Sequence, residues 1–159
     1  MDRPSWDQYF MGMAHHAALR SHDAETKVGC VIINNDKHIL SMGYNGFPSG
    51  CEDSKLPSTR PDKYPFMVHA EQNAISNIVV KSCEPLTAYV THRPCRICAK
   101  LLWQNNVRRW FVEKGSDAES FSDKDGIVFD FLVENGLTFY IMKTDAEPFI
   151  NVYNKLIGD

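Results

Sequence analysis

The sequence has no apolar run long enough for a transmembrane helix, which needs about 18 to 20 consecutive apolar residues. Its first 16 residues also lack the basic start and continuous apolar stretch that are typical of a secretory signal. These two absences predict a cytoplasmic protein that makes no membrane contact.

Neither sign of charge is in large excess. The chain has 17 Lys and Arg residues against 20 Asp and Glu residues, which gives a net charge of −3. A protein that binds a long polyphosphate backbone usually carries an excess of cations, so we expect no nucleic-acid partner. A small anionic ligand needs only a local group of cations, and this composition is compatible with one.

The cysteines do not suggest a secreted disulfide framework, because their number is odd and no secretory signal precedes them. Two of them form a CxxC motif, Cys95 and Cys98. In a reducing compartment this spacing is typical either of half a metal site or of a redox pair.

The remaining composition is that of a globular protein, with 43% hydrophobic and 23% charged residues in a chain of 159. That length suits a single domain. Hydrophobic periodicity and turn residues predict the following elements: helices over 5–21, 69–82, 95–105 and 125–135, strands over 28–34, 38–44, 86–91, 107–112 and 137–142, a long loop over 45–67, and a last amphipathic helix after Pro148. The first two strands form a hairpin, and the later strands alternate with helices. This order predicts a three-layer α/β/α sandwich with a five-stranded mixed sheet.

The strongest chemical signal is a pair of short segments that each open a predicted helix. Cys95 and Cys98 lie on one helical face, and His69 supplies an imidazole. Three such ligands leave the fourth position of a tetrahedral zinc ion open, which is the pattern of a catalytic site. Glu71 is close enough in sequence to His69 to reach a water at that position. Read alone, CxxC is also compatible with a thiol–disulfide oxidoreductase, but that function leaves His69 and Glu71 unexplained.

The combination HxE followed by PCxxC is the signature of zinc-dependent nucleobase deaminases. The chain resembles the deoxycytidylate (dCMP) deaminases of the cytidine deaminase-like superfamily through the following segments: SWDQYF, ALRSHDAETKVGCVI, GYNGFPSGCED, HAEQNAI and YVTHRPCRICAKLL. HAE and PCxxC are shared by the whole superfamily. The segments around 20–29 and 43–50 are the ones that resemble dCMP deaminases.

This resemblance implies hydrolysis of dCMP to dUMP and ammonia, which supplies dUMP for thymidylate synthesis. It implies one catalytic Zn²⁺ ion per chain, with Glu71 as the proton carrier. It further implies that the backbone of Ala70 binds the base, that Asn45 binds the deoxyribose and that His92 lines the base site. The 5′-phosphate site implied by the resemblance comprises Arg20, Ser21, Thr26 and Lys27.

The family resembled is commonly a homohexamer that is activated by dCTP and inhibited by dTTP. The matching effector residues would be Gly43, Tyr44, Gly46, Phe47 and Asp53, with Asp53 as an oxygen ligand for Mg²⁺ on a triphosphate. The same loop is alternatively only a wall of the active site. Two other functions stay open, namely a zinc deaminase acting on another base, nucleoside or tRNA, and a catalytically silent nucleotide-binding module.

Overall fold

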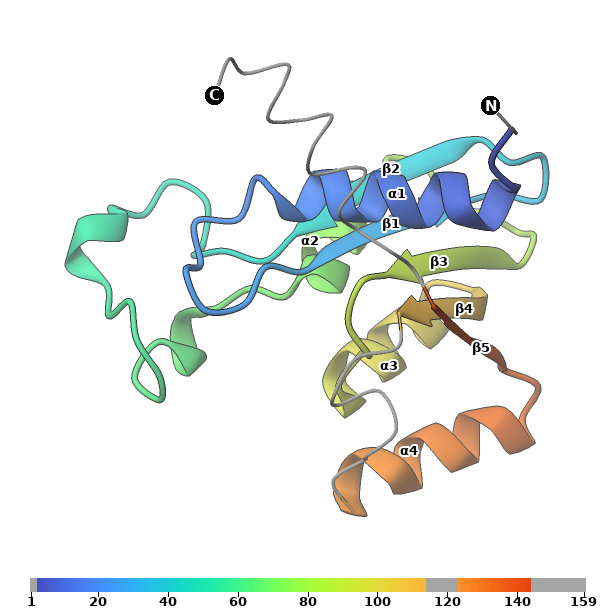
Figure 1. Cartoon of the computed structure of the whole chain (residues 1–159). Helices are drawn as coiled ribbons and strands as arrows, with labels where there is room; N and C mark the ends of the chain where they lie inside the picture. The colour runs from blue at the N-terminus through green and yellow to red at the C-terminus, as the bar shows by residue number, and fades with distance from the viewer. Residues whose placement is uncertain (1–2, 114–122, 144–159) are drawn as a thin grey trace.

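The computed structural model describes residues 3–113 and 123–143. The helix predicted after Pro148 lies outside the described residues. The elements are, in chain order, α1 (Trp6–Ala18), β1 (Gly29–Ile33), β2 (Ile39–Tyr44), the 3₁₀ turns η1 (Asp53–Lys55) and η2 (Tyr64–Phe66), α2 (Ala70–Ser76), β3 (Leu86–Val90), α3 (Arg96–Gln104), β4 (Val107–Glu113), α4 (Asp123–Glu134) and β5 (Thr138–Met142) (Figure 1).

The strands of the described chain form one five-stranded sheet with the order β2-β1-β3-β4-β5. β1 pairs antiparallel with both β2 and β3, whereas β4 pairs parallel with β3 and with β5. The hairpin between β1 and β2 turns at Lys37, which has a φ of 64°, and Asn34 Oδ1 accepts a hydrogen bond of 2.8 Å from the His38 N–H. The predicted mixed sheet and its opening hairpin are therefore confirmed.

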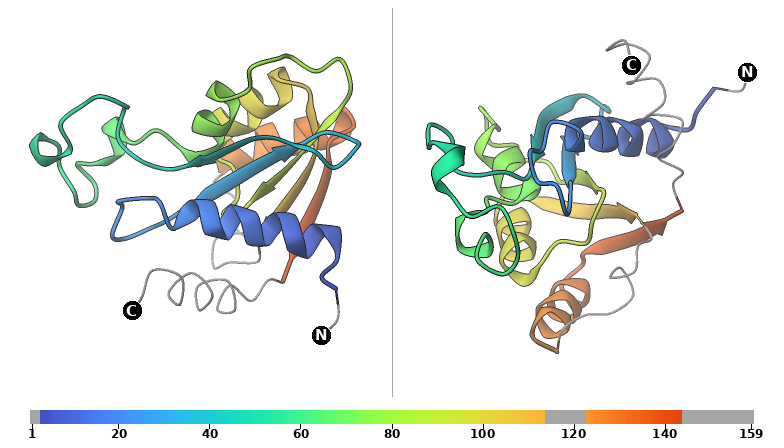
Figure 2. Two further views of the ribbon diagram at one scale, coloured as in Figure 1. Left: turned by 90° about the horizontal axis from the view of Figure 1, so that it is seen from above. Right: turned by 60° about the vertical axis from the view of Figure 1, so that its left-hand side comes forward.

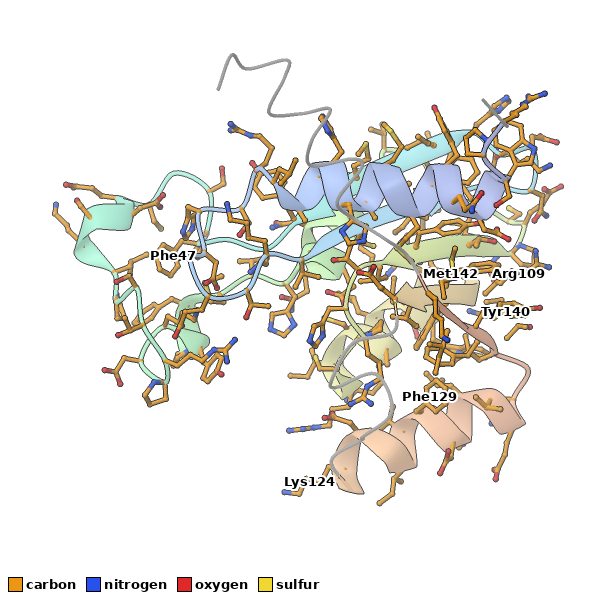
Figure 3. All side chains as sticks on the ribbon, viewed as in Figure 1. Phe47, Arg109, Lys124, Phe129, Tyr140 and Met142 are labelled. Atoms are coloured by element: carbon orange, nitrogen blue, oxygen red, sulfur yellow. The ribbon has the colours of Figure 1, made fainter. Side chains whose placement is uncertain are left out.

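The sheet has an apolar cluster on each face, and each cluster belongs to different helices. Figure 2 shows α1 on one face of the sheet and the later helices on the other. Phe10, Met11 and Ala14 of α1 pack on Val31 and Tyr89 on one face. On the other face, α2, α3 and α4 cover the alternate strand residues. Figure 3 shows Phe129 of α4 on this side, and its ring centroid lies 4.6 Å from that of Phe139 on β5. This arrangement is the predicted three-layer sandwich.

For α1 and α2 the helix starts are closer to prediction than the helix ends, and α1 ends at Ala18, three residues before the predicted end. Ser5 and Gln8 form the capping box at the start of α1, where Ser5 Oγ accepts from the Gln8 N–H at 3.2 Å and Gln8 Oε1 accepts from the Ser5 N–H at 2.8 Å. The prediction of a helix over 69–82 is wrong beyond Ser76. The following Val79 and Val80 are 94% and 75% exposed, so no core packing offsets the low helix propensity of these β-branched residues.

The long loop between β2 and α2 extends beyond one end of the sheet (Figure 1). Near its start, the backbone of Gly46 pairs with Val68 in an isolated bridge, so the two ends of the loop are held together. Among the residues that the structure describes, no helix combines the length and apolar character that a bilayer crossing requires.

Candidate active site

The predicted metal ligands come together at the amino-terminal ends of two helices. His69 is the N-cap residue of α2, Cys95 is the N-cap residue of α3, and Cys98 lies in the first turn of α3. His69 Nδ1 lies 3.6 Å from Cys95 Sγ and 3.3 Å from Cys98 Sγ. The three ligand atoms all lie within 4.8 Å of one another. The backbone N–H of His69 donates to Gln72 Oε1 at 2.8 Å, which holds the start of α2 in place.

The chemistry of this donor set fits zinc. One imidazole nitrogen and two cysteine sulfurs are soft ligands that zinc accepts in tetrahedral geometry, and three protein ligands leave one position open. A hydrogen bond from Cys98 and the contact with His69 together outweigh the effect of burial and lower the pKa of Cys95 to about 4. The same thiol–thiolate contact, together with burial, raises the pKa of Cys98. One thiolate is therefore favoured even before a cation neutralises the pair.

Glu71 projects from the first turn of α2 beside these ligands. Only 3% of the surface of Glu71 is exposed, and this burial raises the pKa of its carboxyl group. Glu71 lines a cavity of about 330 Å³ together with His69 and Cys95. This volume lies in the range of small-molecule sites. A buried carboxyl group beside a metal-ligand cluster, with room for a small molecule in front of it, is an arrangement suited to proton transfer.

The structure brings some of the predicted substrate residues to this cavity. Thr26, Asn45, Ala70 and His92 line it. Asn45 Oδ1 accepts from the Val28 N–H at 2.8 Å, and Asn45 Nδ2 donates to the Thr26 carbonyl at 2.9 Å. A primary amide has two donors and two acceptor lone pairs, so Asn45 keeps one donor and one lone pair beyond these two bonds.

The structure does not bring the other three predicted phosphate residues to the cavity wall. Arg20 and Lys27 are exposed on the surface and are not among the lining residues. Ser21 is buried, and its hydroxyl oxygen accepts a hydrogen bond of 3.2 Å from the Asp23 N–H. Its hydroxyl therefore shapes the turn after α1, away from the cavity.

The cations that do line the cavity are Arg60, Lys63 and Arg93, and sequence analysis missed all three. Lys63 Nζ lies 2.7 Å from Asp23 Oδ1 in a buried ion pair. Arg60 donates to the Thr26 hydroxyl. The length of the loop over 45–67 was a general signal of function, but it did not indicate which of its basic residues turns inward.

The predicted effector residues separate into different environments. An added Cβ on Gly43 would lie 2.3 Å from the Ala70 carbonyl oxygen, so this glycine permits the close approach of β2 to α2. Phe47 lies among the loops at the end of the sheet (Figure 3), where its N–H donates to His22 Nε2 at 3.1 Å. Asp53 is exposed at the start of η1 and does not line the cavity.

The other two predicted effector residues lie at the base of the same loop. The carbonyl oxygen of Tyr44 accepts a hydrogen bond of 2.7 Å from Asn73 Nδ2, which joins β2 to α2. An added Cβ on Gly46 would lie 3.4 Å from the His22 ring. Neither Tyr44 nor Gly46 lines the cavity.

Comparison with known proteins gives a consistent result. A family model described as the cytidine and deoxycytidylate deaminase zinc-binding region matches residues 4–114. The deoxycytidylate deaminase of Mus musculus is 38% identical over 126 residues, which are 74% of this chain and 71% of that protein. The deoxycytidylate deaminase of Pongo abelii is 40% identical over 113 residues, and the match spans 67% of this chain but only 64% of the relative's length.

A solved structure is also similar. The dCMP deaminase of the cyanophage S-TIM5, in complex with dCMP and dUMP, superimposes with a TM-score of 0.68 at 28% identity, covering 89% of this chain and all of the other. The family match spans more than half of the chain and includes His69, Glu71, Cys95 and Cys98. The chain belongs to the cytidine and deoxycytidylate deaminase family.

Proposed function

We propose that this protein hydrolyses dCMP to dUMP and ammonia. The observation that carries the proposal is the placement of buried Glu71 beside the cluster of His69, Cys95 and Cys98 in one cavity. The similarity to relatives named as deoxycytidylate deaminases supports dCMP as the substrate. Release of dUMP would supply the precursor of thymidylate, and we place this activity in the cytoplasm.

In the proposed reaction, zinc held by His69, Cys95 and Cys98 would supply the Lewis acidity that makes water a nucleophile near neutral pH. Glu71 accepts a proton from the attacking water and delivers it to N3 of the pyrimidine. It then accepts the second proton from the hydroxyl group added at C4 and delivers it to the departing amine. The two proton transfers balance, because Glu71 returns to its starting state when ammonia leaves. The burial of Glu71 keeps its carboxyl group from exchanging protons freely with solvent.

The rest of the cavity would bind the remaining parts of the nucleotide. The Ala70 N–H donates to the base carbonyl, because the first amides of a helix have no intrahelical acceptor. The remaining donor and lone pair of Asn45 bind the deoxyribose hydroxyl, and His92 borders the base. We assign the 5′-phosphate to the cationic wall near Thr26 and Arg60.

The test is ammonia release from dCMP, dCTP, deoxycytidine, cytosine, adenosine and a tRNA anticodon stem. We expect dCMP to have the highest kcat/KM, because charge-assisted hydrogen bonds to its phosphate add binding energy that deoxycytidine lacks. Equal efficiency on dCMP and deoxycytidine would indicate a nucleoside deaminase. Activity on the tRNA stem alone would indicate a tRNA deaminase, and inactivity on the whole panel would favour a silent nucleotide-binding module.

We propose in addition that the active form is a homohexamer regulated by dCTP as activator and dTTP as inhibitor. Residues 44–53 would form the effector site, and Asp53 would hold a triphosphate-bound Mg²⁺ ion. Asn45 lies in this segment and also lines the cavity, which gives a physical route for coupling the two sites. We expect a sigmoidal dependence on dCMP that dCTP makes hyperbolic. A hyperbolic dependence that neither triphosphate changes, in protein of known oligomeric state, would remove this part of the proposal.

A further inference from the structure

A single buried lysine joins the two loops that form one wall of the cavity. Lys63 comes from the long loop after β2, and Asp23 and Glu25 come from the loop between α1 and β1. Lys63 Nζ lies 2.7 and 2.9 Å from the two carboxylate oxygens of Asp23 and 2.5 Å from Glu25 Oε2. The side chains of Lys63 and Asp23 are 3% and 4% exposed. This ion pair connects segments that are 40 residues apart in sequence.

The contacts of Lys63 indicate a structural role for its charge. An ammonium group has three donors, and the three carboxylate oxygens around Lys63 occupy them. Two anionic carboxylates already surround this cation, so it has little net charge to offer a further anion. Lys63 lines the cavity, but its ammonium group is directed to the protein itself.

The anionic partner of Lys63 also fixes the turn that presents Thr26. Asp23 Oδ1 accepts hydrogen bonds from the Glu25 N–H at 2.8 Å and the Thr26 N–H at 3.1 Å, in addition to that from Lys63. The position of the Thr26 hydroxyl is therefore set by the same carboxylate that holds the long loop.

Arg60 lies three residues before Lys63 in the same loop. The Lys63 N–H donates to the Thr59 carbonyl at 3.1 Å, so Arg60 is contained in a turn that Lys63 closes. The Arg60 side chain is 48% exposed, lines the cavity, and donates to the Thr26 hydroxyl. Its Nε lies 3.7 Å from Glu25 Oε2, a looser contact than that of Lys63. Of the two cations of this loop that line the cavity, Arg60 is thus the one that carboxylates do not enclose.

We propose that Lys63 is a positioning residue, whose buried ion pair with Asp23 sets Thr26 and Arg60 for recognition of the anionic end of the substrate. This inference rests on the proposed function and adds a residue that does not itself contact the substrate. Removing one partner of a buried ion pair leaves an unpaired charge, which the two loops can hydrate only by separating. Separation moves Arg60 away from Thr26 but leaves the metal ligands and Glu71 in place on α2 and α3.

The experiment compares the zinc-loaded wild-type protein with Lys63→Met and with Lys55→Met as the matched control. Lys55 lies on the same loop and pairs with Glu52 at 2.6 Å, but this pair is exposed and local. The measurements are zinc content, kcat and KM for dCMP and deoxycytidine, and hydrogen exchange of residues 56–66. We expect Lys63→Met to raise KM for dCMP about tenfold, the factor for one charge-assisted hydrogen bond, with kcat changed by less than about twofold.

The same variant should lower kcat/KM for deoxycytidine far less than that for dCMP and leave the zinc content unchanged, while residues 56–66 exchange faster. Asp23→Asn is the second variant, because its side-chain oxygen still accepts the two backbone hydrogen bonds and only the charge is lost. It should show the same KM effect, and it tests the inference if Lys63→Met does not fold. An unchanged KM for dCMP in Asp23→Asn, or equal losses on dCMP and deoxycytidine, would overturn the positioning role. Failure of the wild-type protein to deaminate dCMP would instead refute the proposed function.

Discussion

Replacement of Gly43 by alanine tests whether this residue has a packing role or contacts an effector. The added Cβ would lie 2.3 Å from the Ala70 carbonyl oxygen and 2.4 Å from the Ala74 N. Both atoms belong to the backbone of α2, so no side-chain rotation relieves the contact. Overpacking of a core costs about 1–3 kcal/mol, and the rigidity of these atoms places Gly43→Ala near the upper value of about 3 kcal/mol.

The assay is urea denaturation of the zinc-loaded protein. With an m-value of about 2 kcal/mol/M, a loss of about 3 kcal/mol lowers the midpoint by about 1.5 M. Because His69 begins α2, displacement of this helix should also weaken metal binding and reduce kcat. Gly46→Ala is the control, since its Cβ would contact only the His22 ring, at 3.4 Å. A Gly43→Ala protein as stable as Gly46→Ala would refute the packing role and return Gly43 to the candidate effector site.

Three further predictions concern the site and its ion pair. Glu71→Gln should retain zinc but lose about 10²–10⁴-fold in kcat, the range for removal of a general acid–base, and near-normal turnover would assign proton transfer to another residue. Cys98→Ala should lose both zinc, measured by metal analysis, and thermal stability, because the metal site is coupled to folding; full deaminase activity without metal would contradict the mechanism. Burial opposes ionisation of Asp23, but hydrogen bonds and the charge of Lys63 outweigh it and lower the pKa of Asp23. The free energy of unfolding of wild type should therefore exceed that of Asp23→Asn by its full amount above the ordinary pKa of 3.8. This stability difference should disappear as the pH falls through the lowered pKa of Asp23. A difference that stays constant with pH would contradict the prediction.

The sequence was sufficient to predict the cluster of metal ligands, because short local motifs and helix starts mark each ligand residue. Cys95 and Cys98 are one helical turn apart, and both helices that carry the ligands begin directly at a ligand residue. Alternating strands and helices likewise indicated the sheet and its layers. The end of α2 was predicted less well, because it depends on where the core stops covering residues such as Val79.

The sequence did not predict the cations that line the cavity, Arg60, Lys63 and Arg93, and the physical reason is a different one. The resemblance implies a phosphate site that includes Arg20 and Lys27, but side-chain direction in a loop depends on distant partners. Lys63 turns inward because Asp23, 40 residues earlier, supplies a buried carboxylate. No periodicity or spacing within either loop indicates that Lys63 pairs with Asp23.

The residues proposed for chemistry therefore lie on different elements from those proposed for phosphate recognition. His69, Glu71, Cys95 and Cys98 lie on helices α2 and α3, whose backbones pack on the sheet through buried residues such as Gly43. The residues near the proposed phosphate site lie on two loops that are joined by side-chain bonds. A perturbation of the sheet–helix contact should change metal binding, stability and kcat together, whereas a perturbation between the loops should change mainly KM for the charged substrate. Under the proposed function, substitutions in the two loops would alter the preference for a phosphorylated substrate and leave the residues proposed for deamination unchanged.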